Sequence, residues 1–245
     1  MIAIDDWSVK MKAVRFFILA ILALCAHGLA VAQGEQSVDK LVKEFETTKE
    51  FWRQFEVAKK LVARGDKSAL PALESWLNNE DRPERCVAAF VFAGLGNDRG
   101  LQVIIAILND MSDRPVTGAP PGNSLREQIR ADRHYAVYVL GELKDKRAVP
   151  LLIPLLRDEG ISFEVAWALG EIGDDRAVSP LIEALRNKDP AVRLIAIHAL
   201  EKLRASDALP HLHALLNEYE KIHYAAQVLV AEAAKAAIAA LETKR

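Results

Sequence analysis

The chain has 245 residues, of which 51% are hydrophobic and 27% are charged, and its 32 basic and 34 acidic side chains leave a net charge of -2. This near-neutral, apolar composition excludes an intrinsically disordered protein and lacks the basic excess that is typical of nucleic-acid binding. The two cysteines, Cys25 and Cys86, are too few for a disulfide framework or a cysteine-based metal site. We therefore expect one folded unit or one long repeat array, with no cofactor and no structural metal.

Residues 1–32 are typical of an export signal. Two basic residues, Lys12 and Arg15, precede an uninterrupted apolar run over residues 16–26, and small residues stand before Gln33, where we expect cleavage. The run is shorter than the roughly 20 apolar residues that cross a bilayer as a stable helix, so a retained membrane anchor is the weaker alternative. We therefore expect an exported protein, either periplasmic or secreted.

Two further interpretations of this N-terminus stay open. The acidic residues Asp5 and Asp6 are atypical of a signal, which makes Met11 an alternative start of translation. Cys25 follows an apolar segment, as in a lipoprotein, but Leu24 stands where that signal requires a small residue. Cleavage before Gln33 is therefore the preferred interpretation.

Residues 33–56 are expected to form a helical cap. Ser37 and Thr47 are candidate helix starts, and Glu50 stands three residues after Thr47, as in a capping box. The next helix has a bulky apolar face that consists of Phe51, Trp52 and Phe55. Such a cap would shield the first unit of the array that follows.

Residues 57–221 contain one motif repeated five times with a period of about 30 residues. The copies begin at Leu61, Phe92, Leu140, Leu169 and Leu200. Three of the four offsets between neighbouring copies are 29 or 31 residues, and the remaining offset, between the second and third copies, is 48. A fixed period of this length predicts a stack of similar units rather than a globule.

Each copy predicts a helix, a tight turn and a second helix. In the fourth copy, apolar residues recur with helical spacing over residues 165–172 and again over 178–185. A short oxygen acceptor that suits a helix N-cap stands in the turn of four copies, at Asp66, Asn97, Asp145 and Asp174. Prolines that suit a first helical turn follow at Pro71, Pro150, Pro180 and Pro210.

The succession of R-x-x-A, A-L-G-x-I-G-D and R-A-V-x-P-L-I-x-A-L resembles the short HEAT-like repeat, which also occurs in the phycobilisome lyase group. The resemblance covers residues 55–217. It implies an all-α, right-handed solenoid of about five armadillo-like helical hairpins, whose second helices line a concave surface that usually binds other proteins. Because the repeat occurs in proteins with unrelated activities, the resemblance identifies the fold more specifically than the function.

The insertion between the second and third copies covers residues 112–124. It contains three prolines and two glycines, which predicts a surface loop rather than a helix. Such a loop is either a binding element or a tolerated insertion. At the other end, residues 222–245 are alanine-rich and amphipathic, and we expect them to form a C-terminal capping helix.

The sequence contains no motif for catalysis. Deoxyhypusine hydroxylases, which are HEAT-like enzymes, hold two iron ions with His-Glu dipeptides, and none of the six histidines here precedes a glutamate. His211 and His213 are two residues apart and would point to different sides of a helix. His198 aligns with Tyr138 and Trp167 of the preceding repeats, so we expect it to pack. We therefore expect no catalytic, cofactor-binding or metal-binding residue.

Three equivalent arginines, Arg85, Arg133 and Arg193, stand near the start of the first helices. We expect them to pair with the turn aspartates of adjacent repeats and to form an Asp-Arg ladder that connects the array. A basic track for nucleic acid is the alternative, but the exported part of the chain is slightly acidic.

A polar row on the second helices is the candidate partner-binding site. Two rows of equivalent positions, three residues apart on the second helices, should face outward. The five candidate residues from these rows are Asn109, Arg157, Glu183, Arg186 and Asn217. The alternative explanation is that such residues only terminate their helices. The expected function is an exported scaffold that binds another protein of the cell envelope through the concave helices, with no nucleic-acid partner and membrane contact only through a retained N-terminus.

Two other functions stay open. One is a lyase- or isomerase-like enzyme that uses the groove of the solenoid. The other is a structural subunit of an envelope assembly.

Overall fold

The computed structural model describes residues 36–112, 125–219 and 225–243. These residues form α-helices and short 3-10 helices, and no strand is present among them. The predicted export segment, residues 1–32, and nearly all of the predicted loop at 112–124 lie outside the described residues. Over the described chain the structure confirms an all-α solenoid.

The described helices form five successive hairpins with a cap at each end. The first helices are α3 (Phe51–Arg64), α5 (Arg82–Gly94), α7 (Leu125–Leu143), α9 (Ser162–Ile172) and α11 (Pro190–Lys202). The second helices are α4 (Ala69–Leu73), α6 (Asp98–Asn109), α8 (Val149–Leu152), α10 (Val178–Ala184) and α12 (Leu209–Tyr219). The caps are α2 (Val38–Thr47) and α13 (Ala225–Glu242). The predicted boundary between residues 56 and 57 lies inside α3, which continues from the cap into the first repeat.

Short 3-10 helices extend several of the second helices. They are η1 (Glu74–Asn78), η2 (Lys146–Ala148), η3 (Ile153–Arg157), η4 (Asp175–Ala177) and η5 (Ser206–Ala208). Pro154 lies within η3 and has no amide hydrogen to donate, which explains why α8 ends after one turn. The second helices are therefore less regular than the first.

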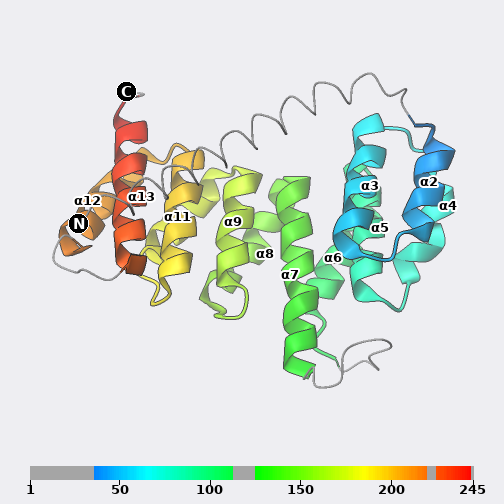
Figure 1. Ribbon diagram of the computed structural model, residues 1–245, viewed down its shortest axis with the longest axis horizontal. Coiled ribbons are helices and arrows are strands. Elements are labelled where there is room, and N and C mark those ends of the chain that lie inside the picture. The colour runs from blue at the N-terminus through cyan, green and yellow to red at the C-terminus, as the bar shows by residue number, and fades with distance from the viewer. Residues whose placement is uncertain (1–35, 113–124, 220–224, 244–245) are drawn as a thin grey trace, which may run out of the picture.

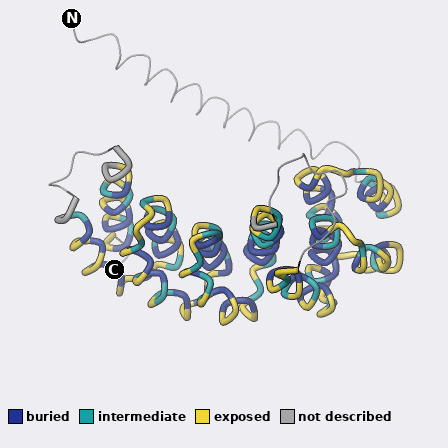
Figure 2. The backbone as a smooth tube through the Cα atoms, turned by 90° about the horizontal axis from the view of Figure 1, so that it is seen from below, coloured by how far each residue is buried: buried dark blue, intermediate teal, exposed yellow. Residues whose placement is uncertain are grey.

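The helices pack in two layers, and the array is curved (Figures 1 and 2). Figure 2 shows α7, α9, α11 and α13 on the inner side of the curve and α8, α10 and α12 on the outer side. The expectation that the second helices line the concave surface is therefore wrong. Small residues explain the direction of the curve: a Cβ atom added at Gly170 of α9 would lie 2.8 Å from Cβ of Ala199 in α11, so these first helices approach closely.

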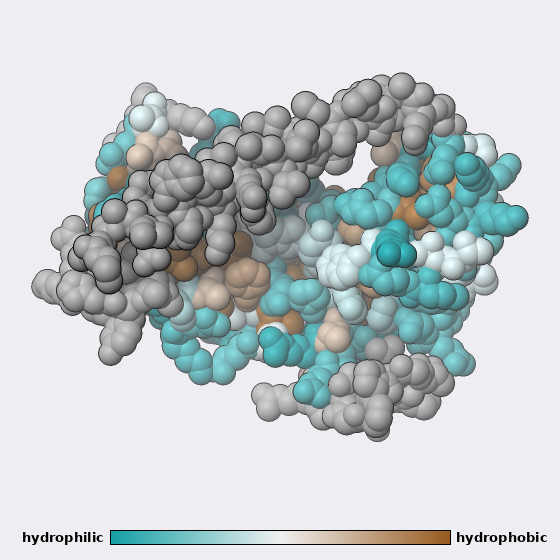
Figure 3. Space-filling model, viewed as in Figure 1, coloured by the Kyte–Doolittle hydropathy of each residue, from teal (hydrophilic) through white to brown (hydrophobic). Residues whose placement is uncertain are grey.

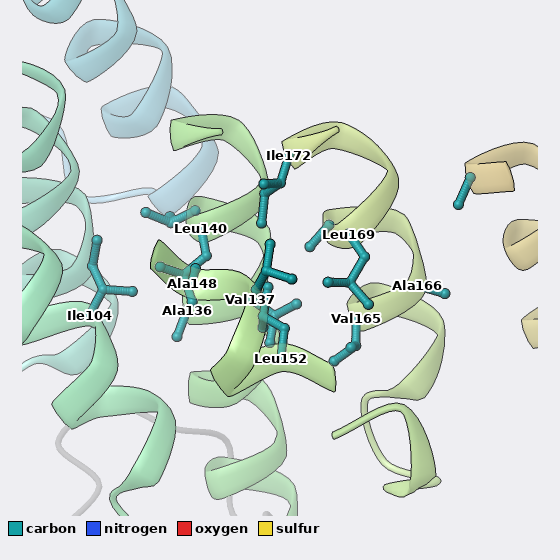
Figure 4. Close-up of a cluster of buried hydrophobic side chains, with 14 of the residues drawn as sticks. Ile104, Ala136, Val137, Leu140, Ala148, Leu152, Val165, Ala166, Leu169 and Ile172 are labelled. Carbon is teal, nitrogen blue, oxygen red and sulfur yellow. The ribbon is translucent and has the colours of Figure 1, made fainter. Parts of the chain in front are cut away.

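An apolar core fills the space between the two layers. Figure 4 shows its centre, where side chains of α7 and α9 meet those of α6 and α8. Leu140, Leu152 and Leu169 are fully buried there. Burying one such side chain contributes about 2 kcal/mol to stability. The periodic apolar positions of the sequence are thus the positions that hold the layers together.

The turn inside each hairpin contains one residue in the left-handed backbone region. It is the fourth residue after the start of each copy: Gly65, Gly96, Lys144, Gly173 and Arg204, with φ of 67°, 79°, 54°, 72° and 54°. Glycine adopts this conformation without steric cost, whereas Lys144 and Arg204 do not. The recurrence of the conformation shows that the five turns are built alike, which the sequence did not reveal at the two non-glycine positions.

Of the predicted caps, Asn97 is confirmed for α6, and Asp145 and Asp174 cap the 3-10 helices η2 and η4 that precede α8 and α10. Asp66 stands in the turn before α4, whose N-cap residue is Ser68. Asp66, Asn97, Asp145 and Asp174 each accept a hydrogen bond from the backbone amide two residues later, at 2.9 to 3.1 Å. Ser37 caps α2 as expected. The capping box at Thr47 is wrong, because Thr47 is the last residue of α2 and Glu50 itself caps α3 by accepting from the amides of Trp52 and Arg53.

One Asp-Arg pair, Arg147 with Asp98, connects the turns of neighbouring repeats, and it does not involve the predicted arginines. Arg85 and Arg193 donate to the backbone carbonyl groups of Asn79 and Asn187, which end the preceding second helix. Arg133 binds the carboxylate of Asp158 at 2.6 Å. These bonds lie away from the turn aspartates, because a guanidinium at the start of a first helix lies at the opposite end of the hairpin.

The arginines that pair with the turn aspartates stand two residues after them. Arg147 binds Asp145 of its own turn at 2.6 Å and Asp98 of the preceding repeat at 2.7 Å. Arg176 donates to the carbonyl oxygen of Lys146 in the preceding repeat at 2.8 Å. The arginine of each R-A-V segment therefore connects neighbouring repeats.

A buried charge cluster connects the repeats on either side of the insertion. Arg82, at the start of α5, binds Asp132 of α7 at 3.1 Å and Asp110 after α6 at 2.5 Å. The side chain of Arg82 is only 6% exposed and that of Asp132 is fully buried. Arg82 also donates to the hydroxyl of Ser112 at 2.8 Å. These bonds fix α7 against the second hairpin despite the longer connection.

Candidate functional site on the two faces of the array

Three of the predicted site residues come together on the outer layer. Arg157, Glu183 and Arg186 line a groove of about 500 Å³ between η3 and α10. Arg157 and Glu183 form an ion pair at 3.6 Å, with side chains that are 86% and 69% exposed. Arg186 also lines a neighbouring groove of about 430 Å³ that extends to α12. This cluster is polar, solvated and on the convex side of the array.

The two other predicted residues do not join this groove. Asn109 is exposed at the end of α6. Asn217 lies in α12, but its side chain is outside the described residues. Asn109, Arg157 and Arg186 stand at or just after the end of a helix or 3-10 helix, which also fits the interpretation that they terminate it.

A larger groove of about 970 Å³ lies between the start of α7 and the turn before α9. Three arginines line it, but two of them have partners there: Arg130 donates to the carbonyl of Gly160 at 3.0 Å and Arg133 binds Asp158. Glu127 and Glu159 also line this groove. Its charge is therefore mixed, and its geometry favours no particular ligand.

The inner face carries a continuous set of aromatic side chains from different repeats. The rings of Tyr138 in α7 and Trp167 in α9 are stacked, with centroids 4.8 Å apart and planes at 3°. Trp52 of α3 meets Tyr138 edge to face at 5.0 Å. Trp52 also contacts Tyr135 at 5.9 Å and His134 at 6.5 Å. We call Trp52, Tyr138 and Trp167 the aromatic ladder.

The ladder is accessible as well as packed. Trp52 is 43% exposed, and Tyr138 and Trp167 are half-buried. Phe163, one turn before Trp167, is also 43% exposed, although the interior would favour its burial. Figure 3, which looks onto this face, shows apolar residues gathered over α9 and α11. Exposed aromatic and apolar side chains in one area are typical of an interaction surface.

His198 of α11 occupies the equivalent position in the next repeat. Its side chain is 55% exposed and lies 3.9 Å from Glu201. With Trp167, Glu171 and Lys202 it lines a narrow cleft of about 50 Å³ between α9 and α11. The expectation that His198 packs in the interior is therefore wrong.

The alignment of the repeats could have identified this site. It places Tyr138, Trp167 and His198 at one position, but their large size suggested packing rather than an accessible surface. The missing information was which layer faces inward.

Carboxylates surround the ladder and change its electrostatics. Burial, together with the hydrogen bond and charge of Glu142 and the charges of Glu56 and Glu171, raises the pKa of Tyr138 to about 12. Burial favours a higher pKa of Glu164, but a hydrogen bond with His134 at 3.0 Å, a backbone hydrogen bond and the charges of His134 and Arg130 together lower it. The inner face therefore combines aromatic rings with negative charge.

Among the described residues, no group of three or more histidine, cysteine, aspartate or glutamate side chains is placed to hold a metal ion. None of the described helices is long and apolar enough to span a bilayer.

Comparison with known proteins gives one family. The family model described as HEAT repeats matches residues 123–187 and 161–231. No curated protein sequence matches the chain.

Three solved structures are similar in their helical arrangement. The complex of CpcE and CpcF of phycocyanin lyase from Nostoc sp. PCC7120 is 21% identical, with a TM-score of 0.44, and the match covers 81% of this chain and 76% of that one. A designed armadillo repeat protein in complex with a (KR)4 peptide is 19% identical, with a TM-score of 0.46 and coverage of 83% and 100%. Human deoxyhypusine hydroxylase is 19% identical, with a TM-score of 0.38 and coverage of 84% of both chains. The family match shows HEAT repeats in residues 123–231 of the chain.

Proposed function

We propose that the protein is an exported, non-catalytic scaffold that binds another protein of the cell envelope on its inner face. HEAT repeats support a role in protein interaction generally. The export signal expected in residues 1–32 supports the location. The proposal moves the binding surface from the outer groove at Arg157 and Arg186 to the aromatic ladder.

The main support for this proposal is that the aromatic side chains of the ladder are partly exposed on three different helices. Trp52, Tyr138 and Trp167 come from α3, α7 and α9, so a bound chain would contact several repeats at once. Tryptophan and tyrosine are enriched among the residues that dominate binding energy at interfaces. The outer groove has no aromatic residue among its described lining residues, and its charged side chains Arg157 and Glu183 are highly exposed, so they should contribute little to affinity.

Photo-crosslinking in cells can test which face binds. The photoreactive amino acid p-benzoylphenylalanine would replace Phe163 on the inner face in one strain and Arg186 in the outer groove in a matched control strain. We expect one dominant envelope protein in the adducts from position 163 and none from position 186. Adducts from position 186 alone would return the site to the outer groove, and no adduct from a folded, exported protein at position 163 would contradict the proposal.

The location has its own test. We expect the mature protein, isolated from the periplasmic or secreted fraction, to begin at Gln33 in N-terminal mass spectrometry. A cytosolic protein that retains residues 1–32 would contradict export without bearing on the inner face.

A further inference from the structure

Three carboxylates border the aromatic ladder, and only two of them form ion pairs with described lysine side chains. Glu56 is paired with Lys59 at 2.5 Å, and Glu171 lies between Lys202 at 2.5 Å and Lys144 at 3.6 Å. Glu142, one helical turn after Tyr138, forms no ion pair with a described lysine or arginine. The centre of the ladder therefore has an aromatic surface next to a carboxylate that no described cation neutralises.

Two other places in the chain show that an aromatic ring beside a carboxylate binds a cation. The ammonium group of Lys59 lies 5.4 Å from the ring centroid of Phe55 and 2.5 Å from the carboxylate of Glu56. The ammonium group of Lys49 lies 5.1 Å from the ring of Trp76, and a carboxylate of α5 binds it at 3.3 Å. In both places a cation is held between an aromatic ring and a carboxylate, and both attractions favour the charged group.

We propose that the inner face binds an extended segment of the partner protein that carries arginine or lysine side chains, one of which lies against the Tyr138–Trp167 stack beside Glu142. This inference rests on the proposed function and adds the chemistry of the partner. Charge complementarity selects the occupant, because an acidic segment would meet the carboxylate of Glu142, which no described lysine or arginine neutralises. A purely apolar segment would desolvate the charge of Glu142 and leave it with its hydrogen bond with Tyr138 but with no cation.

The geometry of the layers also suggests the spacing of the basic residues. Packed helices lie roughly 8 to 10 Å apart. A segment in the polyproline II conformation rises roughly 3.1 Å per residue and makes one turn in three residues, so about three residues pass each repeat and the same side of the segment faces each one. A segment that crosses α7, α9 and α11 would therefore present an equivalent side chain to each repeat at every third position.

Isothermal titration calorimetry on the full chain tests the inference with synthetic peptides. The probe has the sequence Arg-Ala-Ala repeated four times, and the two control peptides carry glutamine or glutamate in place of arginine. We expect the arginine peptide to bind at least about tenfold more tightly than the glutamine peptide and the glutamate peptide to show no binding. We also expect the affinity for the arginine peptide to fall as salt is added.

Two matched glutamate substitutions test whether the arginine peptide binds beside Glu142 on the inner face. Glu142→Gln should weaken binding of the arginine peptide by about fivefold. Glu183→Gln, which removes an exposed carboxylate from the outer groove, should leave it unchanged. Circular dichroism melting curves of both variants show whether they are folded.

The outcomes separate this inference from the proposed function. Equal affinity for the three peptides, or no effect of Glu142→Gln, would overturn the basic segment while crosslinking at position 163 would still support an inner-face partner. If no partner crosslinks at position 163, the proposed function fails first and this inference fails with it.

Discussion

The two layers of the array differ in how neighbouring repeats are connected. In the inner layer, buried or half-buried groups make the contacts: the Arg82–Asp132 pair, the Tyr138–Trp167 stack and the close approach at Gly170. In the outer layer the connections include exposed ion pairs, such as Arg157 with Glu183. Buried contacts depend on shape and desolvation, whereas exposed pairs are weakened by water and salt. The inner layer should therefore control stability and recognition, and the outer layer should tolerate change.

Removing a buried charge and removing an exposed charge should give the largest difference in the free energy of unfolding. Asp132→Ala should lower the free energy of unfolding by about 3 kcal/mol, because it removes a buried partner of Arg82. Urea denaturation followed by circular dichroism measures this value. Glu183→Gln, the exposed control, should change it by less than about 0.5 kcal/mol. Similar losses for both variants would show that burial does not distinguish the layers.

Close packing in the inner layer should have the next largest effect. Gly170→Ala should cost about 2 kcal/mol, since the new Cβ would lie 2.8 Å from Cβ and 2.9 Å from Cα of Ala199. Gly160→Ala is the control before α9, where only a side-chain oxygen of Asp158 lies nearby, at 3.2 Å. Thermal melting compares the two variants. If Gly170→Ala is as stable as the parent, close approach is not the reason for the direction of the curve.

The sequence predicted the hairpins well because their signals are local. Apolar periodicity and the turn oxygens at Asp145 and Asp174 determine where helices begin, and the structure confirms both. The concave side could not be predicted from such local signals, since it depends on how closely Gly170 of α9 approaches Ala199 of α11, far along the sequence. The predicted outer row was polar in sequence and is polar in the structure, but only the curvature shows that it faces away from the aromatic ladder.

The turns that connect the two layers should respond to backbone strain. Gly173→Ala should cost about 1 kcal/mol because φ is 72°, although no atom lies within 4 Å of the new Cβ. Arg204→Gly, at the equivalent position with φ of 54°, should instead stabilise the protein by about 0.5 kcal/mol. Urea denaturation of both variants measures the two changes. Changes of the same sign would contradict a common turn conformation.

The same turns should also contribute a pH-dependent effect. Hydrogen bonds from Arg176 lower the pKa of Asp174 from its ordinary value of 3.8 to about 2. Because the folded-state pKa is lower than that of the unfolded chain, the charge of Asp174 stabilises the protein above about pH 4 and loses this effect as the pH falls toward 2. Asp174→Asn keeps a capping oxygen but removes the charge. The melting temperature of the parent should therefore exceed that of Asp174→Asn at pH 7, and the difference should vanish near pH 2.

The smallest effect is expected in the outer groove. A double-mutant cycle with Arg157→Ala and Glu183→Ala should give a coupling energy below about 0.5 kcal/mol, because the two side chains are 86% and 69% exposed and lie 3.6 Å apart. The coupling should fall further when sodium chloride is raised to 1 M, where the screening length is about 3 Å. A coupling of 1 kcal/mol or more that persists in salt would mean that the outer pair connects repeats as strongly as the buried contacts of the inner layer. In that case tolerance to change would not distinguish the two faces, and the exposed charges of the outer groove would have to be reconsidered as a second binding surface.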